Sequence, residues 1–246
     1  MLKSLPSTLR AALLVAGALM WAGAVATTAQ AGTAQAGTGQ ADTGQTKVSQ
    51  TEATQNGAAA KADTTKADAK LPAVPDYTEG SATAPIHVIE YGAFTCPHCA
   101  EFHATVYPKL KKNYIDTGKM KFTFRAFFFN RYGLWADMIA RCGGEQRFFG
   151  IADMLYDQQT DWVGAGSADK VIAKLKTIGR SAGLTDGQMD QCLKDGPMAQ
   201  ALVAKFQKES AADKIDGTPT FMINGKKYSN MDYAAFSKIL DGLSKK

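Results

Sequence analysis

The sequence has few cysteines and no long run of like charges. Only four of its 246 residues are cysteine, at positions 96, 99, 142 and 192. That density is too low for a small scaffold held together mainly by disulfides, and the chain is long enough to bury an apolar core. The formal net charge is +5, and lysines are scattered among acidic residues. This pattern is typical of a solvated surface, so we expect no nucleic-acid partner.

Residues 32–70 contain no aromatic residue, no leucine and no isoleucine. The stretch 31–45 reads "AGTAQ", "AGTGQ" and "ADTGQ", a threefold repeat of small polar residues. Such a segment cannot offset its ordering entropy by apolar burial, so we expect 32–70 to be a disordered tether. The segment also lacks the periodic apolar stripe of an oligomerisation helix. We therefore expect a monomer.

The N-terminus combines positive charge with one short apolar run. Lys3 and Arg10 precede the apolar stretch 11–25, and an A-x-A site ends at Ala31. This layout predicts a secretory signal peptide over 1–31, because the run is short for a membrane span of about 20 residues. The N-terminus has no pair of adjacent arginines, so nothing indicates the twin-arginine export route. We expect a periplasmic protein, with an uncleaved membrane anchor as the alternative.

The remaining segment, 71–246, has the pattern of one α/β domain. Ile86 to about Tyr91 is a buried-strand candidate, and apolar residues recur at helical spacing after the cysteine pair. Pro108 is expected to kink that helix. The stretch "KMKFTFRAF" alternates between apolar and polar residues as a strand does. We expect these two strands to be parallel, because a helix connects them.

A helical block and a hairpin complete the predicted order. Residues 134–214 have a helical pattern with breaks such as "GG" and "GAGS", which predicts an insertion of four or five helices. "TPTFMINGKKY" then predicts two short strands joined by an Asn-Gly turn. The C-terminal stretch places Phe236, Ile239, Leu240 and Leu243 on one helical face.

The pair in "CPHC" is expected to lie at the first turn of the helix. Pro97 is favoured there, because its missing N–H would have no helical partner. Cys96 then faces free N–H groups and the positive end of the helix dipole, which stabilise a thiolate. His98 adds a nearby donor. Cys99, one turn further, is expected to be more buried and to resolve a mixed disulfide.

A lone C-x-x-C has two other interpretations. Zinc sites use the same spacing, but zinc needs two more ligands and the sequence has no second C-x-x-C. His87 and His103 offer no paired spacing; we expect an ordinary strand position for His87 and a packing role for His103. A structural disulfide is the second possibility. The strand–CxxC–helix context favours a redox pair over both, and no metal is expected.

Two motifs together resemble a known family. "EYGAFTCPHC", followed later by "GTPTFMING", resembles the DsbA-like branch of the thioredoxin superfamily over about residues 75–244. The resemblance implies a thioredoxin fold with a helical insertion and a protein disulfide oxidoreductase without an organic or metal cofactor. It also implies two kinds of partner, namely reduced exported proteins and a membrane reoxidant of the DsbB type.

The resemblance assigns roles to residues outside the cysteine pair. Glu90 is either a strand-end carboxylate in contact with solvent or a buried acid that relays the proton of Cys99. DsbA-like proteins often carry Glu at this spacing, which favours the relay. Thr218 and Pro219 resemble the cis-proline loop that docks substrate beside the CxxC motif. Valine is more common than threonine before that proline in DsbA oxidases, and threonine is common in isomerase-type relatives.

The other two cysteines fall inside the helical block. Cys142 and Cys192 are either two buried thiols or a second, structural disulfide. Export to an oxidising compartment favours the disulfide, and some DsbA-like proteins carry a similar extra pair. We assign this pair no catalytic role. The nearby aromatic run "FRAFFFNRYGLW" is expected to belong partly to the core and partly to a groove for unfolded chains.

These observations predict a periplasmic thiol:disulfide oxidoreductase that introduces disulfides through Cys96 and Cys99. Stabilising the Cys96 thiolate stabilises the reduced enzyme, so the disulfide becomes the stronger oxidant. The first alternative is a reductase or isomerase with the same site. The second is a non-catalytic thioredoxin-like chaperone or binding module, which the intact CPHC motif disfavours.

Overall fold

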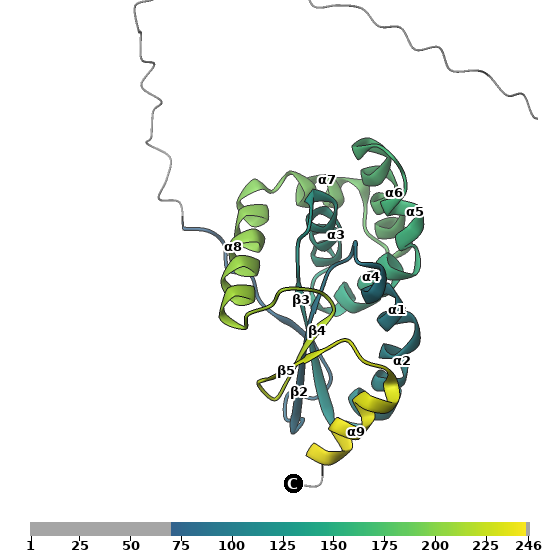
Figure 1. Ribbon diagram of the computed structural model, residues 1–246. Helices are drawn as coiled ribbons and strands as arrows, with labels where there is room; N and C mark the ends of the chain where they lie inside the picture. The colour runs from purple at the N-terminus through teal and green to yellow at the C-terminus, as the bar shows by residue number, and fades with distance from the viewer. Residues whose placement is uncertain (1–69, 245–246) are drawn as a thin grey trace, which may run out of the picture. The chain divides into compact units, whose positions relative to one another are not determined.

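The computed structural model describes residues 70–244, which form a mixed sheet surrounded by helices (Figure 1). The sheet has five strands in the order β1-β3-β2-β4-β5. The strands are β1 Tyr77–Glu79, β2 Ile86–Gly92, β3 Met120–Ala126, β4 Thr220–Ile223 and β5 Lys226–Ser229. The predicted signal peptide, and the predicted tether up to residue 69, lie outside the described residues.

Strands β2 and β3 are parallel, as predicted, and the other pairs are antiparallel. The connection between β2 and β3 runs through α1 Pro97–Thr105, α2 Tyr107–Leu110 and the π-helical turn Lys111–Ile115. The helix is interrupted at Val106, two residues before Pro108. A proline cannot continue the helical hydrogen bonding and clashes with the preceding turn, so the predicted kink is confirmed.

Strand β1 is an element that the sequence patterns do not indicate. It has only three residues and pairs with β3, where Tyr77 lies opposite Phe124. Three residues are too few to show the alternation by which a strand is predicted. The pairing extends the sheet by one antiparallel edge strand.

The insertion contains six helices rather than the four or five predicted. They are α3 Arg131–Cys142, α4 Glu145–Asp157, α5 Gln159–Val163, α6 Ala168–Ser181, α7 Asp186–Lys194 and α8 Gly196–Ala212. The count was too low because Gln158 alone separates α5 from α4, with no glycine or proline at the break. The insertion also begins earlier than residue 134, because the side chain of Asn130 caps α3 by accepting hydrogen bonds from the amides of Tyr132 and Gly133.

The hairpin and the last helix agree with the sequence pattern. Asn224 and Gly225 form the turn between β4 and β5 with φ values of 44° and 81°, as an Asn-Gly hairpin turn requires. Helix α9, Tyr233–Leu243, buries Phe236 and Leu240 against the sheet. No helix among residues 70–244 has both the length and the apolar character that a membrane crossing requires.

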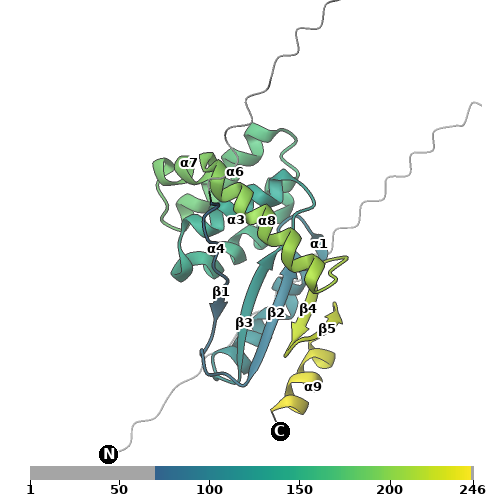
Figure 2. The same ribbon diagram turned by 90° about the vertical axis from the view of Figure 1, so that its left-hand side faces the viewer.

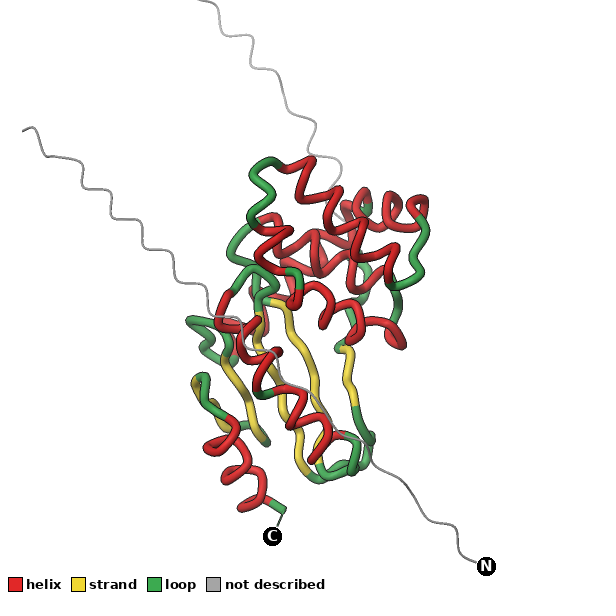
Figure 3. The backbone as a smooth tube through the Cα atoms, turned by 90° about the vertical axis from the view of Figure 1, so that its right-hand side faces the viewer, coloured by secondary structure: helices red, strands yellow, loops and turns green. Residues whose placement is uncertain are grey.

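Helices cover both faces of the sheet. Helix α8 lies across one face in Figure 2, while α1 and α9 lie on the other side of the sheet in Figure 1. The remaining insertion helices gather beyond one end of the strands, as the tube in Figure 3 shows. Apolar side chains fill the space between α1, α3, α4 and α6, and a second cluster lies around α2 and α9.

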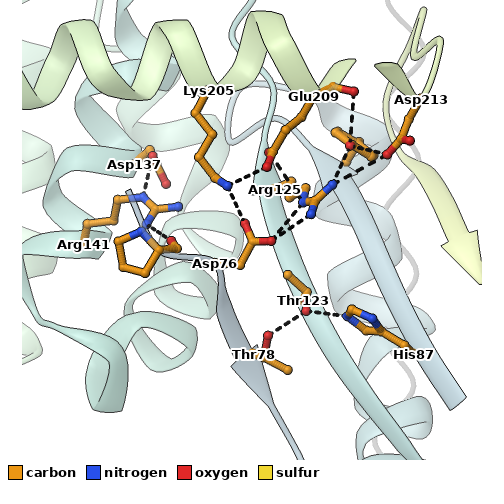
Figure 4. A network of polar contacts seen from close by, with 12 residues as sticks. Asp76, Thr78, His87, Thr123, Arg125, Asp137, Arg141, Lys205, Glu209 and Asp213 are labelled. Atoms are coloured by element: carbon orange, nitrogen blue, oxygen red, sulfur yellow. Dashed lines mark hydrogen bonds and ion pairs between the residues drawn. The ribbon is translucent and has the colours of Figure 1, made fainter. Parts of the chain in front are cut away.

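The face beneath α8 is polar, and a network of charges joins α8 to the sheet (Figure 4). Arg125 of β3 donates hydrogen bonds to Asp76 and lies 3.5 Å from Glu209 and 3.6 Å from Asp213 of the α8 end. Lys205 of α8 contacts Asp76 at 2.9 Å. Arg125, one of the polar residues that alternate with the core residues of β3, therefore ties α8 to the sheet, whereas Thr123 hydrogen-bonds Thr78 and His87.

Candidate active site

Cys96 lies where β2 feeds into α1. Strand β2 ends at Gly92, and the Cys96 amide closes a tight turn by donating to the carbonyl of Ala93 at 2.9 Å. Cys96 is the N-cap residue of α1 and Pro97 is its first helical residue. Proline at this position costs no hydrogen bond, since the first N–H groups of a helix have no partner within it. The predicted placement of the pair is confirmed.

The surroundings of Cys96 stabilise its thiolate form. Its pKa is lowered to about 5, mainly because the Cys99 thiol donates to it, with further help from the backbone amides of Cys99 and His98. Partial burial opposes this shift. The carbonyl of Thr218 lies 3.4 Å from the Cys96 sulfur. Cys96 is 8% exposed, and its sulfur carries a negative charge near neutral pH.

Cys99 has the opposite environment. Its side chain has no solvent exposure, and burial raises its pKa, assisted by the Cys96 sulfur and the negative charge of Glu90. Cys99 therefore stays a protonated thiol until another group accepts its proton. Both cysteines are free thiols in this structure. A slightly exposed thiol with a low pKa beside a fully buried thiol with a high pKa suits one attacking and one resolving cysteine.

The Thr218–Pro219 peptide bond is cis and lies beside Cys96, as the sequence motif predicts. The hydroxyl of Thr218 is buried without a hydrogen-bond partner. β4 begins immediately after this pair, at Thr220, and pairs with β2. The pairing of β4 with β2 therefore fixes the distance between the cis-proline loop and the cysteine pair.

His98 contributes to the site through its backbone. Its side chain is 74% exposed and lies 3.7 Å from Glu101, one turn further along α1. The amide N–H of His98 is one of the groups that lower the pKa of Cys96, with a smaller effect than the Cys99 thiol. Any residue other than proline supplies that amide. The imidazole is exposed and faces Glu101, so its charge acts on Cys96 through solvent.

Glu90 is buried beneath the cysteine pair. Its side chain has no solvent exposure, so it is not a strand-end carboxylate in contact with solvent. One carboxylate oxygen, Oε2, lies 2.8 Å from Nε2 of His103, while the other, Oε1, has no hydrogen-bond partner. His103 packs in the core as expected, but it also forms this buried ion pair. His87 hydrogen-bonds Thr123 at 2.8 Å, an ordinary strand contact.

Gln159 is a site residue that the sequence patterns do not indicate. Its side-chain amide donates to the carbonyls of Phe94 and Cys96 at 2.8 and 3.0 Å, from the first position of α5. The side chain is buried, and a buried amide is retained where it satisfies carbonyls that would otherwise lack a partner. Only the fold brings Gln159 to the active-site loop, 63 residues earlier.

Cys142 and Cys192 form a disulfide with a Cα–Cα distance of 5.9 Å. The bond links the last residue of α3 to α7. Both residues are half-buried and lie in the helical insertion, so the alternative of two buried free thiols is wrong. The disulfide therefore holds two insertion helices together.

The aromatic run that begins in β3 divides between the core and the surface, and the expected groove for unfolded chains stays a prediction. Phe124 belongs to the core, and Phe127 and Phe128 pack against Phe206 of α8. Phe129 is 57% exposed, which makes it one of the few large apolar side chains on the surface of the described residues. An exposed phenylalanine in this loop is available to contact an apolar segment of another chain.

The described residues hold no cluster of three or more His, Cys, Asp or Glu side chains that could bind a metal ion. The dithiol lies above a buried carboxylate, Glu90, and together they make up the candidate reactive centre. A sheet with a parallel β2–β3 pair and a CxxC pair at the N-terminus of the connecting helix define a thioredoxin fold, and α3 to α8 are an insertion into it.

Comparison with known proteins gives the same class. A family model described as thioredoxin matches residues 72–242. A putative protein-disulfide oxidoreductase of Rickettsia bellii is 34% identical over 167 residues, which cover 68% of this chain and 63% of the relative. Disulfide bond formation protein D of Bacillus subtilis is 26% identical, covering 68% of this chain and 74% of the relative.

A solved structure is similar over nearly its whole length. The crystal structure of Wolbachia pipientis alpha-DsbA1 has a TM-score of 0.65 and 28% identity, and covers 71% of this chain and 94% of that one. The chain belongs to the thioredoxin family, in its DsbA-like branch. The predicted family and fold are thereby confirmed, and the names of the relatives agree with the predicted enzyme class. The chain spans about three fifths of the length of the Rickettsia relatives.

Proposed function

We propose that the protein is a thiol:disulfide oxidoreductase acting as an oxidase, which introduces disulfides into exported proteins. The observation that supports this direction is the environment of Cys96, whose pKa is lowered to about 5. A stabilised thiolate favours the reduced enzyme, so the Cys96–Cys99 disulfide readily accepts electrons. Each pKa unit of stabilisation is about 1.4 kcal/mol, which is about 30 mV for a two-electron couple.

The reaction begins when a substrate thiolate attacks the Cys96 sulfur of the oxidised enzyme. The Cys96–Cys99 bond breaks, and Cys99 leaves as a thiolate that takes up a proton. A second thiolate of the substrate then attacks the substrate sulfur that is bonded to Cys96, which forms the substrate disulfide and releases Cys96 as a thiolate. The substrate has lost two electrons and the enzyme has gained them. A membrane reoxidant of the DsbB type is proposed to restore the enzyme disulfide.

Glu90 and the cis-proline loop serve this reaction in different ways. Glu90 is proposed to exchange protons with Cys99, since its charge already acts on that thiol and its Oε1 has no other partner. The backbone of Thr218 and Pro219 is proposed to dock an extended substrate chain beside Cys96. His98 is proposed to tune the couple, chiefly through its backbone amide.

The proposed setting follows from the sequence. The predicted signal peptide directs the chain to the periplasm, where reduced exported proteins are the substrates and disulfides persist. The dithiol itself carries the electrons, so the proposed reaction uses no organic or metal cofactor. The proposed enzyme acts as a monomer.

The equilibrium redox potential of the Cys96–Cys99 couple tests the proposed direction. Equilibration against glutathione buffers is expected to give a potential well above the roughly −270 mV of thioredoxin. A potential as reducing as that of thioredoxin would favour the alternative, a reductase or isomerase, for which Thr218 before the cis-proline is the supporting residue. An insulin-reduction assay without any thiol activity would favour a non-catalytic binding module.

A further inference from the structure

The ring of His103 lies between two carboxylates from different elements. Its Nε2 atom is 2.8 Å from Oε2 of Glu90 in β2, and its Nδ1 atom is 3.7 Å from Oδ1 of Asp153 in α4. The His103 side chain is 4% exposed and Glu90 is fully buried, whereas Asp153 is 48% exposed. The three side chains therefore lead from the buried carboxylate to the surface.

Aromatic rings fix the orientation of the imidazole. Tyr156 stacks on it with ring centres 4.2 Å apart and an angle of 20°, and Tyr107 lies 4.8 Å away. Phe102 contacts it edge-on at 5.4 Å. A ring held on several sides cannot rotate away from either carboxylate. Nε2 therefore keeps its hydrogen bond to Glu90, while Nδ1, which has no hydrogen-bond partner, faces Asp153 at 3.7 Å.

The solvent side of His103 opens into a surface pocket of about 180 Å³. This volume is enough for several water molecules, each of which occupies about 30 Å³ in the liquid. The pocket is lined by His103, Tyr107, Pro108, Lys111, Asp153 and Asp157. His103 and Asp153 thus line the same surface pocket, while Nε2 of the ring is bound to the buried Glu90.

Glu90 completes the connection to the cysteines. Its negative charge raises the pKa of Cys99, and its Oε1 atom is buried without a hydrogen-bond partner. A Cβ atom at Gly92 would approach Oε1 to 2.8 Å, so glycine at this position leaves room for the carboxylate. One oxygen of Glu90 is thus bound to His103, and the other is free to accept a proton.

We propose that His103 and Asp153 form the proton route of the resolving cysteine, so that His103 releases a proton towards the pocket whenever Glu90 takes one from Cys99. The inference rests on the proposed function, because it concerns the same dithiol. His103 acts through Glu90 and is a positioning residue in this scheme. Asp153 accepts the proton at the surface and passes it to water.

The proton balance of ring closure can be written atom by atom. With a mixed disulfide at Cys96, Oε1 of Glu90 takes the proton of the Cys99 thiol, and the Cys99 thiolate attacks the Cys96 sulfur. The partner leaves as a thiolate, and its bond to Cys96 is replaced by the Cys96–Cys99 bond. At the same time, Nδ1 of His103 gives its proton to Asp153. One proton enters the buried pair and one leaves it.

This coupling keeps the buried pair neutral. Before the step it consists of a carboxylate and an imidazolium, and afterwards of a carboxylic acid and a neutral imidazole. Without the loss of a proton from His103, an unpaired imidazolium would remain in the core, which is costly. When the disulfide opens, the proton of Glu90 returns to Cys99 and His103 takes one from the pocket.

The groups that face the ring set its charge. Burial disfavours the imidazolium, but Glu90 and Asp153 outweigh it and raise the pKa of His103 to about 9. Cys99 and Tyr156 lie on the active-site side, where the charges of both cysteines and Glu90 act on the buried Tyr156 hydroxyl. Tyr107, Lys111 and Asp157 line the pocket side. His103 therefore starts the step with a proton to release.

Reaction of the reduced protein with DTNB separates the two cysteines. Attack by Cys96 releases a first thionitrobenzoate and leaves a mixed disulfide, and attack by Cys99 releases the second. Stopped-flow absorbance at several pH values follows both phases. His103→Gln is expected to slow the second phase at least about tenfold, because positioned proton transfer typically accelerates a step by about 100-fold or more. The first phase is expected to stay unchanged. The pH profile of the second phase is also expected to move.

Asp153→Asn provides a surface test if His103→Gln fails to fold. It is expected to slow the second phase, while Asp157→Asn, a carboxylate of the same pocket outside the ion pair, is the matched control. A second phase as fast as wild type in Asp153→Asn, or an equal slowing in both variants, would overturn the proposal. Absence of the first phase in wild type would instead count against the proposed function.

A second measurement does not depend on turnover. Glu90→Gln imitates the protonated carboxyl group, so it is expected to leave His103 neutral at pH 7, whereas wild type keeps the imidazolium. Nitrogen NMR of the histidine ring distinguishes the two forms. If His103 keeps both protons in the Glu90→Gln variant at pH 7, the loss of its proton is not coupled to Glu90 and the proposal is wrong.

Discussion

The side-chain amide of Gln159 donates a hydrogen bond of 3.0 Å to the carbonyl of Cys96, and thereby ties the helical insertion to the active-site loop. The same amide also holds the Phe94 carbonyl at 2.8 Å. The loop that positions the attacking sulfur thus depends on a residue of α5. This contact leads to the first of five predictions.

Gln159→Ala is expected to lower the free energy of unfolding by about 1–3 kcal/mol, because two buried carbonyls lose their donor. Urea denaturation of the oxidised protein measures this change. Gln158→Ala is the matched control, since Gln158 is exposed and immediately adjacent. Equal stabilities of the two variants would show that the buried amide contributes nothing to the loop.

Replacement of Cys96 and replacement of Cys99 are expected to affect disulfide exchange in different ways. Cys96→Ser should abolish disulfide exchange, because Cys99 is fully buried and has a raised pKa. Cys99→Ser should accumulate mixed disulfides through Cys96, since the resolving thiol is gone. Mass spectrometry of trapped partners locates the attachment site. Partners attached to Cys99 in a Cys96→Ser background would reverse the proposed order of attack.

The reactivity of Cys96 is expected to follow its lowered pKa. Iodoacetamide alkylation of the reduced protein should rise with pH around a midpoint of about 5, against an ordinary thiol value of 9.0. The stability of the reduced protein should respond with a definite sign. The thiolate contributes fully above pH 9, and this contribution declines as the pH falls and is lost below about 5.

The oxidised protein is the control for that pH dependence, because a disulfide does not titrate. As the pH rises from 5 to 9, the unfolding free energy of the reduced form should therefore increase relative to that of the oxidised form. A difference that is constant over this range would show that Cys96 has an ordinary pKa.

His98→Ala is expected to make the couple less oxidising, by less than about 30 mV, which corresponds to one pKa unit. The reason is that the exposed imidazole acts through solvent, while the backbone amide that stabilises the thiolate is retained. Redox titration against glutathione gives the shift. His98→Pro, which removes that amide as well, should lower the potential further; a larger loss in the alanine variant would assign the main effect to the imidazole.

The Cys142–Cys192 disulfide is expected to stabilise the insertion without taking part in exchange. Its cysteines are 50 positions apart, so replacing both with serine should lower the unfolding free energy by about 4 kcal/mol in the chain-entropy model. Under mild reduction this bond should survive after Cys96–Cys99 has opened. Mass spectrometry of alkylated thiols checks the order, and a free Cys142 before Cys96 would contradict it.

The sequence predicts much of this molecule because several signals are local. The CPHC motif at a helix start, the Asn-Gly turn and the alternation of β3 each depend on neighbouring residues and on backbone geometry that those residues favour. The resemblance to DsbA-like proteins adds Pro219, and the structure agrees with a cis bond there. Short elements without such signals, β1 and α5, were missed.

Only the tertiary structure decides which distant side chains meet. His103 was expected to be a packing residue, because a lone histidine on an apolar helix face gives no sign of its partner. The fold places it between Glu90 of β2 and Asp153 of α4. Gln159 likewise gains its role only when α5 packs against the active-site loop. Local sequence therefore determines where the thiols lie on their helix, while the buried groups that donate, accept and balance charge around them come from elements that packing alone brings together.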